Sequence, residues 1–132
     1  MIAYRKLHGW KYELLEPEML VLPAAFHELG RYFATEYLAL SEDALTVKAW
    51  YLWDGASGPT VDSPSTMRAS LVHDALYQLM RLGVLPRSLK GAADQLLHDL
   101  LIEDGMGRFR AWYWLQAVRW FGSIEVDTCP NG

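Results

Sequence analysis

The sequence has almost no cysteine, because Cys129 is the only thiol among its 132 residues. One cysteine cannot form a disulfide within the chain, so the class of small disulfide-stapled secreted domains is excluded. A reducing compartment is the setting that such a composition favours. We therefore expect the protein to be made and folded in a cytoplasm, and carriage elsewhere by a larger assembly stays open.

The sequence also lacks an excess of positive charge, long apolar runs and internal repeats. Its formal net charge is -4, whereas a nucleic-acid binder needs a basic face. No stretch approaches the ~20 apolar residues that a membrane-spanning helix needs. The first residues also lack the apolar run of a signal peptide. These absences predict that the chain has no nucleic-acid partner and no transmembrane segment.

What the sequence has in quantity is apolar and aromatic surface. Hydrophobic residues make up 52% of the chain, and six Trp and seven Tyr add large side chains. This is enough apolar surface for one core in a chain of this length. We predict a single domain over 1–132, with strands mainly in 1–53, a loop in 54–65, three helices in 66–122 and a tail in 123–132.

The N-terminal half has the composition of short antiparallel strands. Lys11–Glu16 and Met19–Leu22 are extended pieces separated by a proline. Arg31–Leu40 and Ala44–Trp53 are rich in aromatic and β-branched residues, which favour strands. The polar group Ser41–Asp43 between these two segments predicts a hairpin turn.

Three segments of the C-terminal half have the apolar periodicity of helices. They cover about Thr66–Leu82, Leu89–Asp104 and Arg108–Phe121, and a glycine follows each of them, as is common at helix C-termini. Ser88 is the expected N-cap of the second helix. The predicted fold class is α+β, with N-terminal antiparallel strands or a hairpin packed with three C-terminal helices.

A candidate site lies on the first two helices. His73 and Tyr77 are four residues apart, so they share one helix face. Asp94 precedes Leu97 by three residues and Leu101 by seven, which places it on the apolar stripe of the second helix. A carboxylate there is costly unless it is hydrogen-bonded. His73 and Tyr77 are the best partners that a packed neighbour helix can offer.

This arrangement has two interpretations, one catalytic and one purely structural. A carboxylate that fixes one ring nitrogen of His73 leaves the other nitrogen to act as a general base. Asp74 could hold a metal ion, and loop carbonyls around Asp54–Gly58 could complete an oxygen-rich shell that suits calcium. Alternatively, the cluster only ties the two helices together. In that case His98, four residues after Asp94, could also satisfy the carboxylate within one helix.

Several motifs of the chain resemble a known family. They are Asp54-Gly55-Ala56-Ser57-x-Pro59, His73-Asp74-x-Leu76-Tyr77, Ala93-Asp94 and Ala117-Val118-Arg119-x-Phe121-Gly122. Over roughly Trp53–Gly122 this pattern is similar to the domain of unknown function 1353 family of tailed phages and bacterial prophages. The resemblance implies a phage protein made in a host bacterial cytoplasm, with association with the virion as a further expectation. In its first motif, Ser57 and Pro59 would support the loop.

The His-Asp-x-x-Tyr unit also resembles phospholipase A2, above all the capsid-borne viral forms that lack disulfides. The matching residues are His73-Asp74-Ala75-Leu76-Tyr77, followed by Arg81, Gly83, Pro86 and Ala93-Asp94-Gln95. By this resemblance His73 activates water, Asp94 orients His73 and Tyr77 supports Asp94. The implied activity is that of a phospholipase A2-like hydrolase.

Calcium is the cofactor that this second resemblance implies. Asp74 would ligate it, together with Asp54 and Gly55 of an upstream loop that corresponds to Tyr51–Gly58. The loop of the enzymes has the pattern Tyr-x-Gly-x-Gly, whereas Trp53 stands in place of the first glycine here. A bulky side chain at that position can block the close backbone approach that a glycine permits. A non-catalytic relative is therefore the alternative.

The third helix combines aromatic side chains with arginines. They are Phe109, Trp112, Tyr113, Trp114, Trp120 and Phe121, with Arg108, Arg110 and Arg119. Such residues serve as core or as anchors for a protein partner, or they rest on a lipid interface. The expected partners of the helix at 108–121 are thus other phage virion proteins or a phospholipid surface. The rival to the hydrolase hypothesis is a non-catalytic virion protein, for example a structural or assembly protein of the tail.

Overall fold

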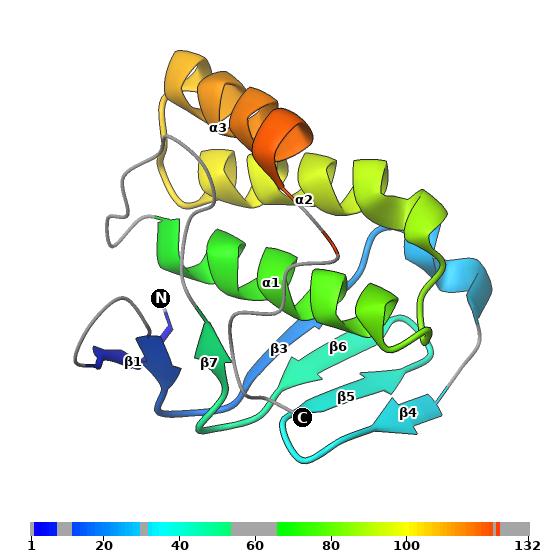
Figure 1. The fold of residues 1–132 in the computed structure, drawn as a ribbon. Helices are drawn as coiled ribbons and strands as arrows, with labels where there is room; N and C mark the ends of the chain where they lie inside the picture. Colours follow the sequence, from blue (N-terminus) through cyan, green and yellow to red (C-terminus); the bar gives the residue numbers. More distant parts are fainter. Residues whose placement is uncertain (1, 8–11, 30–31, 54–65, 123, 125–132) are drawn as a thin grey trace. The chain divides into compact units, whose positions relative to one another are not determined.

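The computed structural model describes residues 2–7, 12–29, 32–53, 66–122 and 124. These residues form two compact units, one with the strands up to residue 53 and one with the helices from residue 66 onward. The described part of the chain holds seven strands in two antiparallel sheets, followed by three α-helices (Figure 1). The α+β class is therefore confirmed. The predicted loop at 54–65 and nearly all of the predicted tail lie outside the described residues.

The first sheet has three strands in the order β1-β2-β7. Its strands are β1 (Tyr4–Lys6), β2 (Tyr12–Leu14) and β7 (Leu52–Trp53), and both pairings are antiparallel. The ring of Trp53 is fully buried and lies 5.5 Å from that of Tyr12 and 6.3 Å from that of Tyr4. Cross-strand aromatic pairs of this kind stabilise a sheet. They explain why so short a sheet forms.

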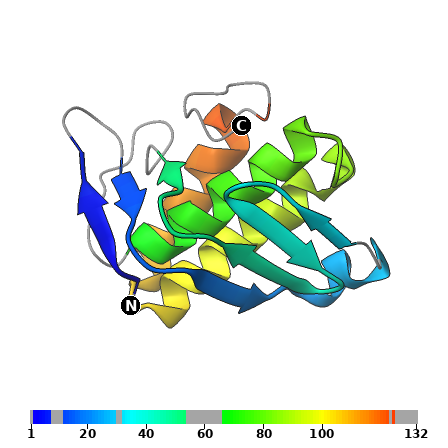
Figure 2. The ribbon, with the colours of Figure 1, turned by 90° about the horizontal axis from the view of Figure 1, so that it is seen from below.

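The second sheet has four antiparallel strands in the order β3-β6-β5-β4 (Figure 2). Its strands are β3 (Glu18–Val21), β4 (Tyr32–Ala34), β5 (Leu38–Ser41) and β6 (Ala44–Val47), and a 3-10 helix, η1 (Ala24–Leu29), follows β3. The hairpin turn predicted at Ser41–Asp43 is confirmed, because Ser41 pairs with Ala44 across it. Glu42 turns the chain with a φ of 53°.

The prediction of one strand over Arg31–Leu40 is wrong. Strand β4 ends at Ala34 and β5 begins at Leu38, so the segment is a hairpin. Thr35 is the cause, because its hydroxyl oxygen accepts the N–H groups of Tyr37 at 3.3 Å and Leu38 at 3.0 Å. Threonine side chains compete with the sheet ladder in this way and close turns.

The prediction of one strand over Ala44–Trp53 is also wrong. Strand β6 ends at Val47, and the backbone of Trp50 then adopts a φ of 74°. A left-handed conformation ends a strand, because it reverses the direction in which the chain extends. After it, Leu52 and Trp53 pair with β2 in the other sheet.

The helical unit contains α1 (Met67–Arg81), α2 (Lys90–Glu103) and α3 (Arg108–Phe121) (Figure 1). The predicted helices are thus confirmed, and α2 packs against both of the others. Gly83 and Gly105 have φ angles of 78° and 100°, which is the conformation expected of a glycine after a helix. None of the described helices has the length and apolar character that crossing a lipid bilayer requires.

The start of α2 differs from the prediction in its N-cap. Ser88 is not the N-cap, because it lies inside a 3-10 turn, η3 (Arg87–Leu89), that follows the extended Pro86. The α-helix therefore begins only at Lys90. In the structure, as in the predicted helix, Lys90 lies one helical turn before Asp94 on the same face of the helix.

Candidate functional site

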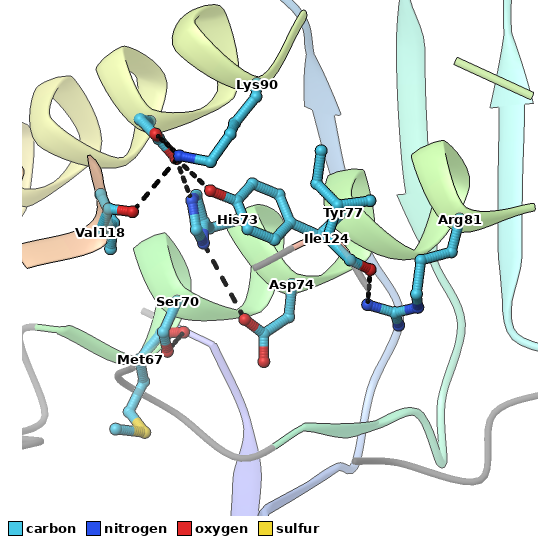
Figure 3. Close-up of polar contacts among 10 residues, drawn as sticks. Met67, Ser70, His73, Asp74, Tyr77, Arg81, Lys90, Val118 and Ile124 are labelled. Carbon is cyan, nitrogen blue, oxygen red and sulfur yellow. Dashed lines mark hydrogen bonds and ion pairs between the residues drawn. The ribbon is translucent and has the colours of Figure 1, made fainter. Parts of the chain in front are cut away.

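The carboxylate of Asp94 is the centre of a polar cluster in the helical unit. Asp94 on α2 is only 1% exposed, and His73 and Tyr77 on α1 are also buried. Its Oδ1 accepts the Tyr77 hydroxyl at 2.6 Å and lies 2.6 Å from Nε2 of His73 (Figure 3). The structure thus brings together the three residues that helical spacing and the phospholipase A2 resemblance single out.

Lys90 is a member of the cluster that sequence reasoning missed. Its Nζ donates to Oδ2 of Asp94 at 2.8 Å and to the carbonyl oxygen of Val118 on α3 at 3.4 Å (Figure 3). A lysine four residues before a buried aspartate was the available signal. Asp94 therefore receives hydrogen bonds on both oxygens, and Lys90 balances its charge.

These contacts decide the protonation states of the cluster. Burial raises the pKa of Asp94, but the hydrogen bonds from His73, Lys90 and Tyr77 outweigh burial, so the pKa lies below its usual value. Burial raises the pKa of the Tyr77 hydroxyl, and its hydrogen bond to Asp94 and the charges of Asp94 and Asp74 raise it further. At neutral pH the site therefore contains an ionised carboxylate and a neutral phenol.

The ionised carboxylate also determines the tautomer of His73. A carboxylate can only accept hydrogen bonds, so Nε2 of His73 must be the donor to Asp94. In a neutral imidazole the other nitrogen, Nδ1, then carries the lone pair. Nδ1 lies 4.0 Å from Oδ1 of Asp74. This distance is too long for a direct hydrogen bond, but one water molecule could bridge the two atoms. The Asp74 side chain is 25% exposed, whereas that of His73 is 4% exposed.

The end of α3 fits closely against the same cluster. A Cβ added to Gly122 would lie 2.4 Å from the carbonyl oxygen of Val118 and 2.9 Å from the hydroxyl oxygen of Tyr77. Both distances are shorter than real Cβ contacts. Only a glycine fits at this position without a shift of the helix end or of the Tyr77 hydroxyl.

We therefore expect Gly122→Ala to lower the free energy of unfolding by about 1–3 kcal/mol, because it overpacks a tight contact. The measurement is urea unfolding followed by circular dichroism. Gly91→Ala is the matched control, since a Cβ at Gly91 would meet nothing within 4 Å and Gly91 lies inside α2. That change should raise stability by about 0.5–1 kcal/mol. Equal effects of the two substitutions would contradict the close fit.

The described residues supply only part of the predicted calcium site. Within them, no group of three or more His, Cys, Asp or Glu side chains could hold a metal ion. Asp74 offers one carboxylate, whereas calcium takes six to eight oxygen ligands. The other predicted residues of the calcium loop, Asp54, Gly55, Ser57 and Pro59, lie outside the described residues.

Two residues at the start of the predicted calcium loop, Tyr51 and Trp53, lie next to or within strand β7 of the first sheet. The carbonyl oxygen of Tyr51 accepts the N–H of Leu14 at 2.9 Å, and Trp53 is a buried residue of β7. Since the Tyr51 carbonyl already accepts a backbone hydrogen bond, it is a poor candidate for a calcium ligand. The described residues alone therefore do not form a calcium shell.

The alternative in which His98 satisfies Asp94 within one helix is wrong. The Nδ1 atom of His98 lies 3.0 Å from Oδ1 of Asp99 and 3.3 Å from Nε2 of Gln95. His98 and Asp99 instead line an open hollow of about 420 Å³, together with Ile102 and Arg108. None of the three residues at the centre of the polar cluster is among these lining residues.

The fold and the site define an α+β protein with a buried histidine–carboxylate pair in its helical unit. The chain belongs to the family described as "Protein of unknown function (DUF1353)", whose model matches residues 32–118. The match begins before Asp54, where the first motif starts, and includes all four residues of the polar cluster, His73, Tyr77, Lys90 and Asp94. No curated protein and no solved structure matches the chain.

Proposed function

We propose that the protein is a phage-type hydrolase similar to phospholipase A2, in which His73 and Asp94 form a water-activating dyad. The observation that supports this proposal best is the orientation of the His73 ring. Nε2 is held 2.6 Å from an ionised, buried carboxylate, and Nδ1 is turned toward the partly exposed Asp74. A histidine that only joins two helices has no need of a second nitrogen facing a solvent-accessible carboxylate.

In this proposal Nδ1 of His73 takes a proton from a water molecule as its oxygen attacks the carbonyl carbon of an ester. The imidazolium that forms is stabilised by the negative charge of Asp94. His73 then gives the proton to the departing alkoxide, so one ester and one water become an acid and an alcohol. Tyr77 and Lys90 position Asp94 and keep it ionised, and neither touches the reacting atoms.

Calcium bound at Asp74, with Asp54 and Gly55, is the cofactor of the proposal. When bound, it would supply positive charge for the oxygen on which negative charge develops during attack. The support from the structure is the place of Asp74, whose carboxylate lies on the Nδ1 side of His73.

The test is release of fatty acid from mixed phospholipid vesicles by the wild type and by His73→Ala. We expect the substitution to lower the rate on the order of 10²–10⁴-fold, since it removes the general base. A chelator should abolish the wild-type rate, and added calcium should restore it. Circular dichroism must show that the variant is folded. Equal rates for the wild type and His73→Ala would refute the hydrolase proposal.

The second candidate function is a non-catalytic virion protein, for example a structural or assembly protein of the tail. The aromatic residues exposed on α3 favour it, because such residues anchor protein interfaces. Detection of the chain in purified virions at fixed stoichiometry would support this candidate. A freely soluble monomer that is absent from particles would count against it. The two candidates are compatible, since a virion can carry an enzyme.

A further inference from the structure

Helix α3 exposes an unusual amount of aromatic surface. Phe109 and Trp120 are 79% and 80% exposed. Three further aromatic residues of the same helix are also exposed, and they are Trp112, Tyr113 and Phe121. Chains that work as isolated monomers rarely expose apolar patches of this kind, which mark surfaces that bind something.

The spacing of these residues makes a stripe. Trp112 and Tyr113 follow Phe109 by three and four residues, and Trp120 follows it by eleven. At 3.6 residues per turn, these positions lie along one side of the helix. The opposite side of α3 is buried, through Ala111, Trp114, Leu115, Ala117 and Val118. The helix therefore has two apolar faces, of which one belongs to the fold and the other faces solvent.

The charges of α3 are of one sign only. The helix contains Arg108, Arg110 and Arg119 and no acidic residue, in a chain whose formal net charge is -4. All three arginines are exposed. Around the helix axis they flank the aromatic stripe, with Arg108 and Arg119 on one side and Arg110 on the other.

We propose that the exposed side of α3 binds the surface of an anionic phospholipid membrane. Helices that lie in a membrane interface combine large aromatic side chains on the inserted face with arginines or lysines that contact anionic headgroups. Trp and Tyr in particular prefer the level of the headgroups. The three exposed arginines of a helix without acidic residues favour a surface of negative charge, and a headgroup layer supplies it along the whole helix.

Contacts within the helical unit connect α3, and therefore this surface, to the polar cluster. The carbonyl oxygen of Val118 accepts a hydrogen bond from Lys90, and Gly122 lies against the hydroxyl of Tyr77. The last turn of α3 therefore contacts two residues that position Asp94. A membrane bound to α3 would hold the polar cluster close to phospholipid, and this consequence, unlike the binding itself, rests on the proposed function.

The experiment is sedimentation with vesicles of phosphatidylcholine alone or mixed with phosphatidylglycerol, without calcium and with calcium. The wild type should bind the anionic vesicles more tightly, and added salt should weaken the binding. Phe109→Ser/Trp120→Ser should lower the binding at least about tenfold, since it removes the two most exposed aromatic side chains. Arg110→Gln/Arg119→Gln should remove most of the preference for anionic vesicles.

Matched controls come from the strand unit. Met19→Ser removes another exposed apolar side chain, 68% exposed on β3, and Lys6→Gln removes an exposed positive charge on β1. Neither should change vesicle binding. No binding to either vesicle, equal binding to both, or equal losses in the control variants would overturn the proposal. So would a dimer in light scattering that Phe109→Ser/Trp120→Ser dissociates while vesicles stay unbound, because the stripe would then bind a second copy of the chain.

The membrane-binding proposal and the hydrolase proposal can be refuted independently of each other. His73→Ala should bind vesicles as the wild type does, because His73 is buried and does not belong to the aromatic stripe of α3. If the wild type binds anionic vesicles and releases no fatty acid, the membrane surface stands and the hydrolase proposal fails. If a soluble short-chain ester is hydrolysed and no vesicle is bound, the hydrolase stands and the membrane surface fails.

Discussion

Replacing Asp94 with alanine should lower the free energy of unfolding by about 3–5 kcal/mol, because it leaves buried polar partners without a counter-ion. The variant would lose the hydrogen bonds from His73, Tyr77 and Lys90 at once. Urea unfolding followed by circular dichroism measures the loss. Asp99→Ala on the same helix is the control, since Asp99 is exposed and a surface change of this kind stays within about 0.5 kcal/mol.

The contribution of Asp94 should also depend on pH in one direction. Its pKa in the fold lies below the usual 3.8, owing to the hydrogen bonds from His73, Lys90 and Tyr77 that outweigh its burial. Its ionised form therefore contributes stability that is complete above the unfolded value and is lost as the pH falls through the lower, folded value. Asp94→Ala should flatten this acid limb of the stability curve. A loss no larger than that of Asp99→Ala, or an unchanged acid limb, would contradict the central place of Asp94.

The second large effect concerns turnover under the hydrolase proposal. Asp94→Asn should lower kcat on the order of 10²–10⁴-fold. An asparagine amide can donate to Nε2 of His73, which then takes the lone pair and leaves the proton on Nδ1. Nδ1, which faces Asp74, would no longer be a base, although the positions of the atoms in the cluster change little. The measurement is kcat for release of fatty acid, at a temperature at which circular dichroism shows the variant folded.

Tyr77→Phe is the matched control for this tautomer argument. It removes one hydrogen bond to Asp94, worth about 0.5–1.5 kcal/mol, and leaves the carboxylate that fixes His73. The kcat value should therefore stay within about tenfold of the wild type. Equal losses of kcat in Asp94→Asn and Tyr77→Phe would show that the cluster acts only through packing.

The geometry of the cluster was predictable because helical spacing is a strong constraint. Asp94 on an apolar stripe needs a partner, and His73 and Tyr77 on one face of the preceding helix were the available ones. Lys90 was missed although the predicted helix over Leu89–Asp104 already places it one turn before Asp94, because apolar periodicity gives no weight to a charged residue in the first turn. Its second contact, with the carbonyl oxygen of Val118 on α3, depends on how the helices pack and cannot be derived from spacing within one helix.

The strand unit was predicted less well, since single side chains and local backbone angles decide where its strands break. The hydroxyl of Thr35 ends β4 by taking two backbone N–H groups, and the left-handed backbone of Trp50 moves the chain from one sheet to the other. Composition over a window of residues cannot reveal either event. The sequence shows that Trp53 stands where the phospholipase A2 pattern has a glycine. It does not show that Trp53 is buried against the rings of Tyr4 and Tyr12.

The ion pair of Lys90 and Asp94 constrains how this protein can evolve. The two charges depend on each other. Without Lys90, the buried carboxylate loses the cation beside it. Without Asp94, the ammonium group keeps the carbonyl oxygen of Val118 and the face of the Tyr77 ring as partners but loses its counter-ion. Relatives that have abandoned the acid should therefore also have abandoned the base, most simply by exchanging both for apolar side chains of similar size. Such a double exchange would preserve the junction of the three helices while ending any chemistry at His73.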